Sequence, residues 1–313
     1  MSEYVKKRGR FALIGARAKR QKYLLVMLAL AVIYVGIFSY GPMWGMLIAF
    51  VNYKPASGLL GSEFMGLHYF RQFLTNPDFP MLMRNTIAIS ALNIVCGIVF
   101  PVLFALLLNE LVGMKFKRVV QTISYLPHFI SYVVVANIAL TVFSPTGGVI
   151  NQALMALGII EKPIFFFAQP KGFWFLIAGI NVWKEMGWAA IIYITSISAI
   201  DPQLYEAAMV DGAGRFKRVI HITLPGILST IVVLTILAIP ELLNAGFEPS
   251  FLLGNPLVSD YSQVIDTYVY SIGLQQGRFS LATAVGLMRM GVGLILILSA
   301  NAFAHKVSDY SLF

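Results

Sequence analysis

The chain has 313 residues, of which 58% are hydrophobic and only 12% are charged, and its formal net charge is +9. Soluble globular domains carry about twice that share of charged residues, so the composition indicates a membrane protein with room for about six spans. The basic excess does not indicate nucleic-acid binding, because eight Lys and Arg residues lie together in segment 1–22, directly before the first apolar run. The single cysteine, Cys96, excludes a disulfide framework within the chain.

Six apolar stretches follow, each long enough to cross about 30 Å of hydrocarbon as a helix of about 20 residues. Backbone amides in lipid must bond within their own segment, so runs of this length predict helices. The first stretch exceeds the apolar core of a cleaved signal peptide and bears bulky aromatic residues, so we expect it to remain as a span. The expected spans are residues 23–50, 85–109, 119–143, 173–199, 219–243 and 280–304.

The distribution of basic residues predicts the topology. Segments on the side of the two termini hold 15 Lys and Arg residues, whereas the segments on the opposite side hold six. Because basic residues favour the cytoplasmic side, we expect both termini in the cytoplasm. The chain is thus predicted to comprise a basic cytoplasmic segment, 1–22, and a six-helix membrane domain, 23–313.

Three segments on the predicted outer side show helical patterns although they are too short to span. Residues 66–79 place apolar side chains at helical spacing, 146–159 is an apolar run, and 260–279 ends near two glycines. We expect short helices that cap the outer face of the bundle.

The fourth and fifth spans are separated by a cytoplasmic insert, IDPQLYEAAMVDGAGRFKRVIHITLPGI, that is longer than a connection needs. Asp201 followed by Pro202 is a strong signal for a helix start, and Gly212 permits the backbone angles that end one. The helix between them would place Leu204, Ala207, Ala208 and Asp211 on one side, where the two alanines let another surface approach the backbone closely. We interpret the loop of about 201–218 as a docking helix beneath the membrane.

The same stretch resembles a known family. Glu206-Ala207-Ala208, Gly212 and the Ile-x-Leu-Pro that ends at Pro225 match the EAA motif, E-A-A-x3-G-x9-I-x-L-P, at every specified position. This motif marks permease subunits of binding-protein-dependent ABC importers. YGPMWGMLIAF, ALLLNE, YLPHFIS and WKEMGW further resemble the permeases that import polysaccharide fragments and complex oligosaccharides.

The resemblance implies an all-α membrane protein with six transmembrane helices, in the type I ABC importer permease fold, with a cytoplasmic coupling helix seated in a separate ATPase. Glu206 would pair with a basic residue of that ATPase, and Gly212 would set the turn after the helix. The residues expected to couple the chain to the ATPase are Glu206, Ala207, Ala208, Asp211, Gly212 and Arg215.

The implied partners are a second homologous permease, an ABC ATPase dimer, an extracytoplasmic sugar-binding protein, the sugar and membrane lipid. ATP and Mg would be bound by the ATPase, because this sequence has no G-x-x-x-x-G-K-[ST] loop. The four histidines are scattered, and we expect no metal site, no cofactor in this chain and no catalytic residue. The expected location is the cytoplasmic (inner) membrane, with several passes.

Three charges lie inside predicted spans, where each costs about 2.5–3.5 kcal/mol. Lys184 and Glu185 are neighbours that should point in different directions, so we expect Glu185 to pair with Arg289 and Lys184 to face a partner or cavity. Such groups could fix helix packing or contact substrate, and nearby aromatic rings could belong to an interfacial belt. The candidate substrate-path residues are Asn181, Trp183, Lys184, Glu185, Tyr193, Glu241, Asn244 and Arg289.

Two other functions are compatible with six spans. An ABC importer permease for a non-sugar solute would share the EAA motif. A secondary transporter driven by an ion gradient would need no ATPase, but many such folds are built from two repeated halves, and this sequence shows no clear internal repeat.

Overall fold

The computed structural model describes the backbone of residues 21–307 and the side chains of residues 21–302. Within that part of the chain every regular element is a helix, apart from one isolated bridge between Val51 and Phe64. The predicted basic segment, 1–22, lies outside the described residues except for its last two positions. The chain divides into two units at Gly66.

The first unit contains the first predicted span. Helix α2 (Lys22–Val35) continues through a π-helical turn, η1 (Gly36–Tyr40), into a 3₁₀ segment, η2 (Gly41–Phe50). The three form one apolar stretch of 29 residues, which is long enough to cross a bilayer. No side chain of α2 is buried, as expected for a helix whose solvent is lipid.

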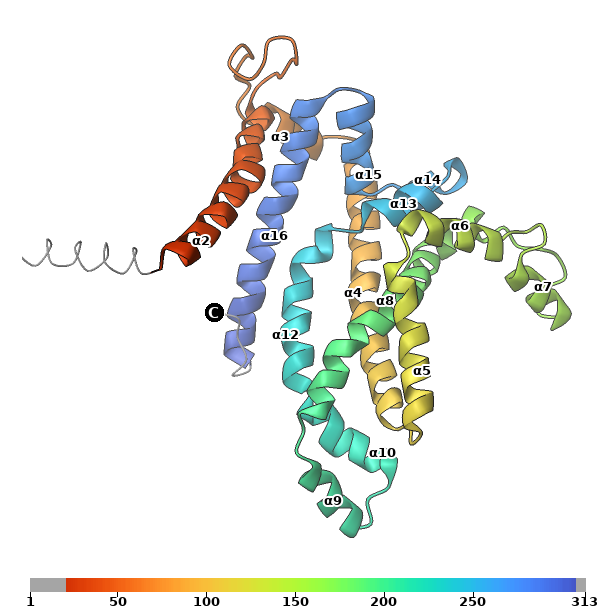
Figure 1. Ribbon diagram of the computed structural model, residues 1–313. Helices are drawn as coiled ribbons and strands as arrows, with labels where there is room; N and C mark the ends of the chain where they lie inside the picture. The colour runs from red at the N-terminus through yellow and green to blue at the C-terminus, as the bar shows by residue number, and fades with distance from the viewer. Residues whose placement is uncertain (1–20, 308–313) are drawn as a thin grey trace, which may run out of the picture. The chain divides into compact units, whose positions relative to one another are not determined.

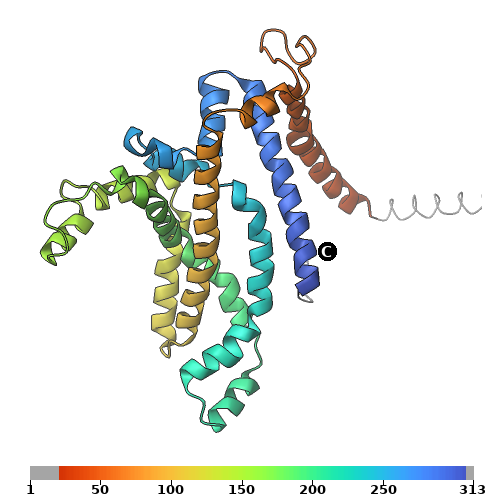
Figure 2. The same cartoon turned by 180° about the vertical axis from the view of Figure 1, so that it is seen from behind.

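Three long helices in the second unit confirm three further predicted spans. They are α4 (Phe79–Asn109), α8 (Phe173–Ser198) and α16 (Phe279–Val307). Helix α4 begins earlier than its apolar run, because Asp78 occupies the N-cap position and Pro80 fits the first turn. Helices α4 and α8 pack along much of their length, as Figures 1 and 2 show.

The third predicted span, 119–143, is wrong as a single straight helix. It consists of α5 (Met114–Tyr125), a 3₁₀ turn η3 (Leu126–Phe129) and α6 (Tyr132–Val142), and the axis bends by 106°. Pro127 has no N–H to donate, and Ser131 is extended, with φ −61° and ψ 148°. Hydropathy did not reveal this break because it reports how apolar a segment is and not where its backbone bends.

The fifth predicted span is also bent, by 54°. It begins as α10 (Arg215–Arg218), η6 (Val219–Thr223) and α11 (Leu224–Gly226), and resumes beyond Ile227. Pro225 lacks the N–H that an unbroken helix would use, which accounts for the weak point. The second part comprises α12 (Leu228–Ala238) and η7 (Ile239–Leu243).

Short helices gather at one end of the second unit, and α9 (Pro202–Val210) and α10 lie at the other (Figure 1). Helices are present in two of the three segments where short helices were predicted, 66–79 and 146–159, whereas the third, 260–279, is interrupted around Gln263. The short elements are α3 (His68–Leu74), α7 (Val149–Ala156), η4 (Phe166–Ala168), η5 (Pro170–Gly172), α13 (Phe247–Leu253), η8 (Pro256–Val258), α14 (Ser259–Ser262), α15 (Ile265–Tyr270) and η9 (Ser271–Gln275).

Candidate functional site

Helix α9 is the predicted docking helix, and its start follows the local sequence. Asp201 is its N-cap: the backbone N–H of Gln203 donates to Asp201 Oδ1 at 2.9 Å. Pro202 takes the first helical position, where no backbone donor is needed. The bond satisfies one of the amides that every helix start leaves without a partner.

The end of α9 depends on Gly212. Its φ is +76°, in the left-handed region that residues with a Cβ avoid. This turn lets the N–H of Gly212 donate to the Met209 carbonyl at 3.1 Å and the N–H of Ala213 donate to the Ala208 carbonyl at 2.8 Å. The glycine of the EAA motif therefore closes the helix, as the sequence predicted.

Two contacts attach α9 to the start of the fifth span. The hydroxyls of Tyr205 and Thr223 lie 3.0 Å apart, and Thr223 is fully buried. Just before α9, Ile200 packs on Gly226 so closely that a Cβ added there would lie 2.6 Å from Ile200 Cδ1. Neither contact was predicted, because each joins residues that are far apart in sequence. Helix α9 is therefore held to the membrane helices and is not a loose loop.

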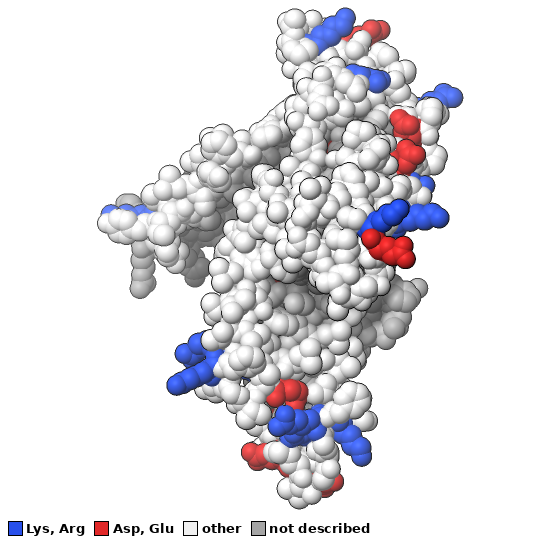
Figure 3. All heavy atoms as spheres, turned by 90° about the vertical axis from the view of Figure 1, so that its right-hand side faces the viewer, with Lys and Arg blue, Asp and Glu red and all other residues white. Residues whose placement is uncertain are grey.

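The surface of α9 and α10 exposes both apolar and charged side chains. Val210 is 88% exposed and Phe216 is 77% exposed, which is unusual for apolar side chains of this size. Among the described residues, the carboxylate of Glu206 has no hydrogen-bond or ion-pair partner. Figure 3 shows the charged groups of this end, with an uncharged zone above them. The other coupling candidates, Ala207, Asp211, Gly212 and Arg215, are also exposed, whereas Ala208 is half-buried.

The predicted pairing of Glu185 with Arg289 is wrong. Lys184 Nζ donates to Glu185 Oε1 at 2.8 Å, and the second carboxylate oxygen, Oε2, lies 2.6 Å from His128 Nδ1. The two sequence neighbours meet because their long side chains both turn toward the third span. Lys184 is buried and lines none of the three cavities described below.

Arg289 instead pairs with Asp266 of α15, through Nη1 and Oδ1. Burial raises the pKa of the Asp266 carboxyl, and the Arg289 guanidinium beside it opposes that rise. The other oxygen, Oδ2, is buried without a hydrogen-bond partner. Sequence reasoning overlooked Asp266 because it lies in an outer segment, and only the fold brings α15 against α16.

Asn181 belongs to a chain of polar groups that crosses three helices. It accepts a hydrogen bond from the Tyr132 hydroxyl at 2.6 Å and donates to Asn93 Oδ1 at 2.9 Å. Asn93, an amide within the second span, was missed although its position in an apolar run is itself a signal. These bonds join α4, α6 and α8 near the broken third span.

Two grooves share Asn93. The first, about 210 Å³, is also lined by Asn181 and Glu185. The second, about 340 Å³, is lined by the remaining polar candidates Tyr193, Glu241 and Asn244. Asn244 Nδ2 donates to Glu241 Oε2 at 2.6 Å. Five of the eight predicted path residues therefore lie in these adjoining grooves, and Lys184 and Arg289 line neither.

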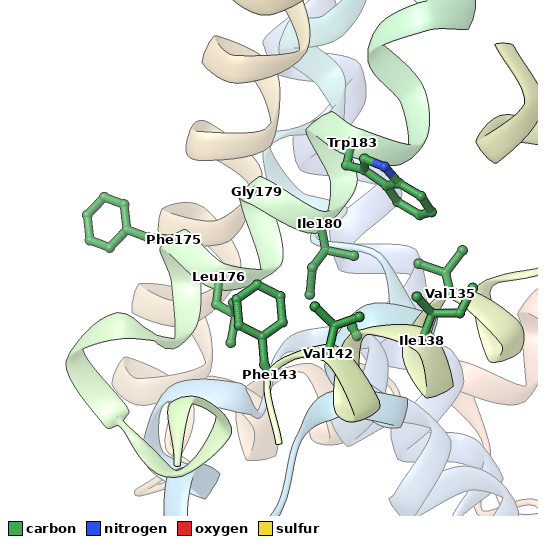
Figure 4. Close-up of a pocket in the computed structure, with 10 residues that line it drawn as sticks. Val135, Ile138, Val142, Phe143, Phe175, Leu176, Gly179, Ile180 and Trp183 are labelled. Carbon is green, nitrogen blue, oxygen red and sulfur yellow. The ribbon is translucent and has the colours of Figure 1, made fainter. Parts of the chain in front are cut away.

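Trp183 lies in a third, apolar cavity of about 430 Å³. Figure 4 shows Val135 and Ile138 of α6 facing the ring of Trp183 across this space, with Val142 of the same helix facing Ile180. The cavity offers flat apolar surface but no charged side chain among its lining residues. Trp183 is therefore separated from the polar candidates. Among the described residues, no group of three or more His, Cys, Asp or Glu could hold a metal ion.

Comparisons with known proteins agree with this architecture. The family of binding-protein-dependent transport system inner membrane components matches residues 97–309. Two Bacillus subtilis proteins are similar over nearly the whole chain. The polygalacturonan/rhamnogalacturonan transport system permease YteP is 45% identical, covering 94% of this chain and 91% of YteP. The protein LplB is 44% identical, and the match covers 95% of this chain and 93% of LplB.

A crystal structure of a bacterial ABC transporter that imports the acidic polysaccharide alginate contains a chain with the same fold. It superposes with a TM-score of 0.85 at 36% identity, over 95% of this chain and 99% of that one. The helices, including the bent third and fifth spans, thus form the type I ABC importer permease fold. The chain belongs to the family of binding-protein-dependent transport system inner membrane components.

Proposed function

We propose that this chain forms half of the translocation pore of an ATP-driven importer of polysaccharide fragments or oligosaccharides. Two similarities support the choice of sugar: the relative YteP is named for polygalacturonan and rhamnogalacturonan transport, and the similar solved permease belongs to an alginate importer. A second, homologous permease supplies the other half of the pore.

The observation that carries the proposal is the anchored and exposed helix α9. Its ends are fixed by Asp201 and Gly212, and Tyr205 ties it to the fifth span, while Glu206 stays available to a partner. We infer that α9 seats in a cleft of an ABC ATPase, where Glu206 meets a basic residue. ATP and Mg bind in the ATPase dimer, and this chain is a non-enzymatic subunit without a cofactor of its own.

The two adjoining grooves are the proposed path for the sugar. Amides and carboxylates such as Asn181, Glu241 and Asn244 can exchange hydrogen bonds with sugar hydroxyls, whereas both carboxylate oxygens of Glu185 are engaged by Lys184 and His128. Trp183 offers a flat apolar surface, in a separate cavity. Lys184 and Arg289 are each matched by a carboxylate, so we assign them to packing and not to substrate contact.

The remaining partners follow from the orientation. We infer that the chain lies in the inner membrane with both termini in the cytoplasm, so that α9 meets the ATPase and the short outer helices meet an extracytoplasmic sugar-binding protein. In support, the alginate importer has also been solved in complex with its pentasaccharide-bound periplasmic protein.

Transport is then a rigid-body switch between two states. ATP closes the ATPase dimer and moves α9, and because α9 is tied to the fifth span, the bundle opens outward and receives the sugar. Hydrolysis returns the bundle to its inward state. The anchoring contacts allow α9 to act as a lever.

The test is ATP-dependent uptake by vesicles that contain this chain with its partner permease, ATPase and binding protein. Glu206→Arg should leave the chain in the membrane but abolish uptake. Gln203→Arg is the matched control, because it introduces the same arginine side chain into α9 and leaves the Glu206 carboxylate in place. Full uptake by Glu206→Arg, or uptake driven by an ion gradient without the ATPase, would contradict the proposal.

A further inference from the structure

The break in the third span leaves a backbone carbonyl without a hydrogen-bond donor in its own helix. After η3 the chain runs extended through Ile130 and Ser131, so the last carbonyls of η3 cannot all bond within a helix. One of them, the carbonyl of His128, accepts a hydrogen bond from Lys184 Nζ at 2.9 Å. The fourth span thus supplies the donor that the third span lacks.

This bond is part of a closed ring of three interactions. Lys184 Nζ also donates to Glu185 Oε1 at 2.8 Å, and Glu185 Oε2 lies 2.6 Å from His128 Nδ1. The ring of His128 stacks on Trp188, with centroids 4.5 Å apart and planes 1° apart. Lys184 is only 8% exposed, and hydrogen bonds to charged groups in such surroundings are among the stronger ones. His128 is therefore held through both its carbonyl and its side chain.

A second contact between the third span and α8 lies one turn further along α8. A Cβ added to Gly187 would overlap the backbone oxygen of Ser124, so the backbones of α5 and α8 touch there without any intervening side chain. Gly187 lies on the side of Lys184 nearer to α9. The third span thus contacts α8 closely at two places, at its break and at Ser124 of α5.

We propose that Lys184, Glu185 and His128 are positioning residues that lock the break of the third span onto α8. This inference rests on the proposed function. Helix α8 runs into α9 within three residues of its end at Ser198, so with the lock in place a movement of α9 carries α8, α5 and α6 together. Without the lock, the break acts as a hinge, and α6 does not move together with α8 and α5. Helix α6 lines the apolar cavity with α8, so the lock also keeps the shape of that cavity (Figure 4).

The first test needs neither sugar nor partners. Thr122→Cys in α5 and Thr141→Cys in α6 carry the spin labels, because both positions are exposed. The full chain, with Cys96→Ser to remove its native cysteine, is placed in lipid nanodiscs. The distance between the two labels then reports the angle across the break. The lock predicts a single narrow distance distribution, and Lys184→Met should broaden it. Thr195→Val is the control on α8, because that hydroxyl bonds only the Ile191 carbonyl of its own helix among the bonds described. An equally narrow distribution in Lys184→Met would overturn the lock.

The second test uses the assembled importer. Lys184→Met should lower sugar imported per ATP by about tenfold, at an unchanged basal rate of ATP hydrolysis per assembled complex. Lys184→Met/Glu185→Gln removes both charges, so no half-buried carboxylate is left without its cation, but the His128 carbonyl stays unbonded. Coupling should therefore stay low while assembly recovers. Lys184→Arg keeps a charged donor and should retain most of the coupling.

Two outcomes would overturn the positioning role: recovery of coupling in the double variant, or a loss of transport that only follows the amount of assembled complex. Failure of the proposed function looks different. In that case the unmodified chain with its partners shows no ATP-dependent sugar uptake, whereas the distance measurement across the break still reports on the lock.

Discussion

The hydroxyl of Tyr205 lies 3.0 Å from the hydroxyl of Thr223, and this bond joins the middle of α9 to the first turns of the fifth span. Thr223 is fully buried, so water competes little for the bond. Together with the packing of Ile200 on Gly226, it attaches α9 at two points. A force on α9 therefore reaches the fifth span directly.

The Tyr205–Thr223 bond should matter for coupling. Tyr205→Phe keeps the ring and removes only the hydroxyl, at a cost of about 1 kcal/mol, so we expect sugar uptake per ATP to fall about fivefold with normal assembly. Thr223→Val removes the other hydroxyl. If loss of the Tyr205–Thr223 bond causes the lower uptake, a double-mutant cycle should show that the double variant loses no more uptake than either single variant. Losses that add up in the double variant would contradict a role for the bond.

Gly212 should be needed for its backbone conformation and not for its small size. A Cβ at Gly212 or at Gly214 would meet nothing within 4 Å, but only Gly212 has a positive φ, +76°, whereas Gly214 has φ −67°. Gly212→Ala should therefore cost about 1 kcal/mol and reduce binding of the ATPase, while Gly214→Ala should be neutral. Co-purification of the ATPase with each variant measures this, and equal losses would show that the turn conformation is not the cause.

The sequence predicted α9 well because its start and end depend on nearby residues. Asp201, Pro202 and Gly212 act within a few positions of themselves, and the structure has each in the predicted role. The exposure of Glu206 and Ala207 follows from the same local pattern.

The ion pairs could not be predicted in the same way. Hydropathy indicates which segments cross the membrane but not which of them are neighbours, so Arg289 was assigned to Glu185 when its partner is Asp266. The Lys184 contacts depend on the break at Pro127, which an apolar run conceals. Long-range pairing and helix breaks thus account for most of what was missed in the candidate path.

Gly187 should be irreplaceable where α5 meets α8. Gly187→Ala would push its methyl group into the Ser124 carbonyl, a backbone atom that cannot move away cheaply, so we expect a loss of about 2 kcal/mol or more in stability. Gly179→Ala on the same helix is the control, because its Cβ would meet nothing within 4 Å. The midpoint of thermal unfolding in detergent compares the two variants. A midpoint for Gly187→Ala as high as that of the control would refute the close contact.

The Asp266–Arg289 pair should show itself as a pH dependence once the arginine is removed. Arg289→Met leaves the Asp266 carboxyl buried without the group that lowers its pKa, so that pKa should rise further above its ordinary value. The folded chain then binds the proton more tightly than the unfolded chain. Stability should therefore be kept at low pH and lost as the pH rises above about 4 and through the raised pKa of Asp266.

The matched control for this prediction is Asp266→Asn/Arg289→Met, which has no ionisable group at either position. Breaking a buried pair on one side costs about 3 kcal/mol, whereas removing both charges costs much less, so the double variant should be the more stable of the two at neutral pH. Its unfolding midpoint should also lack the slope with pH that Arg289→Met shows over the same range. A slope that persists in the double variant would place the titrating group elsewhere, and equal midpoints at neutral pH would mean that Asp266 reaches water when Arg289 is absent.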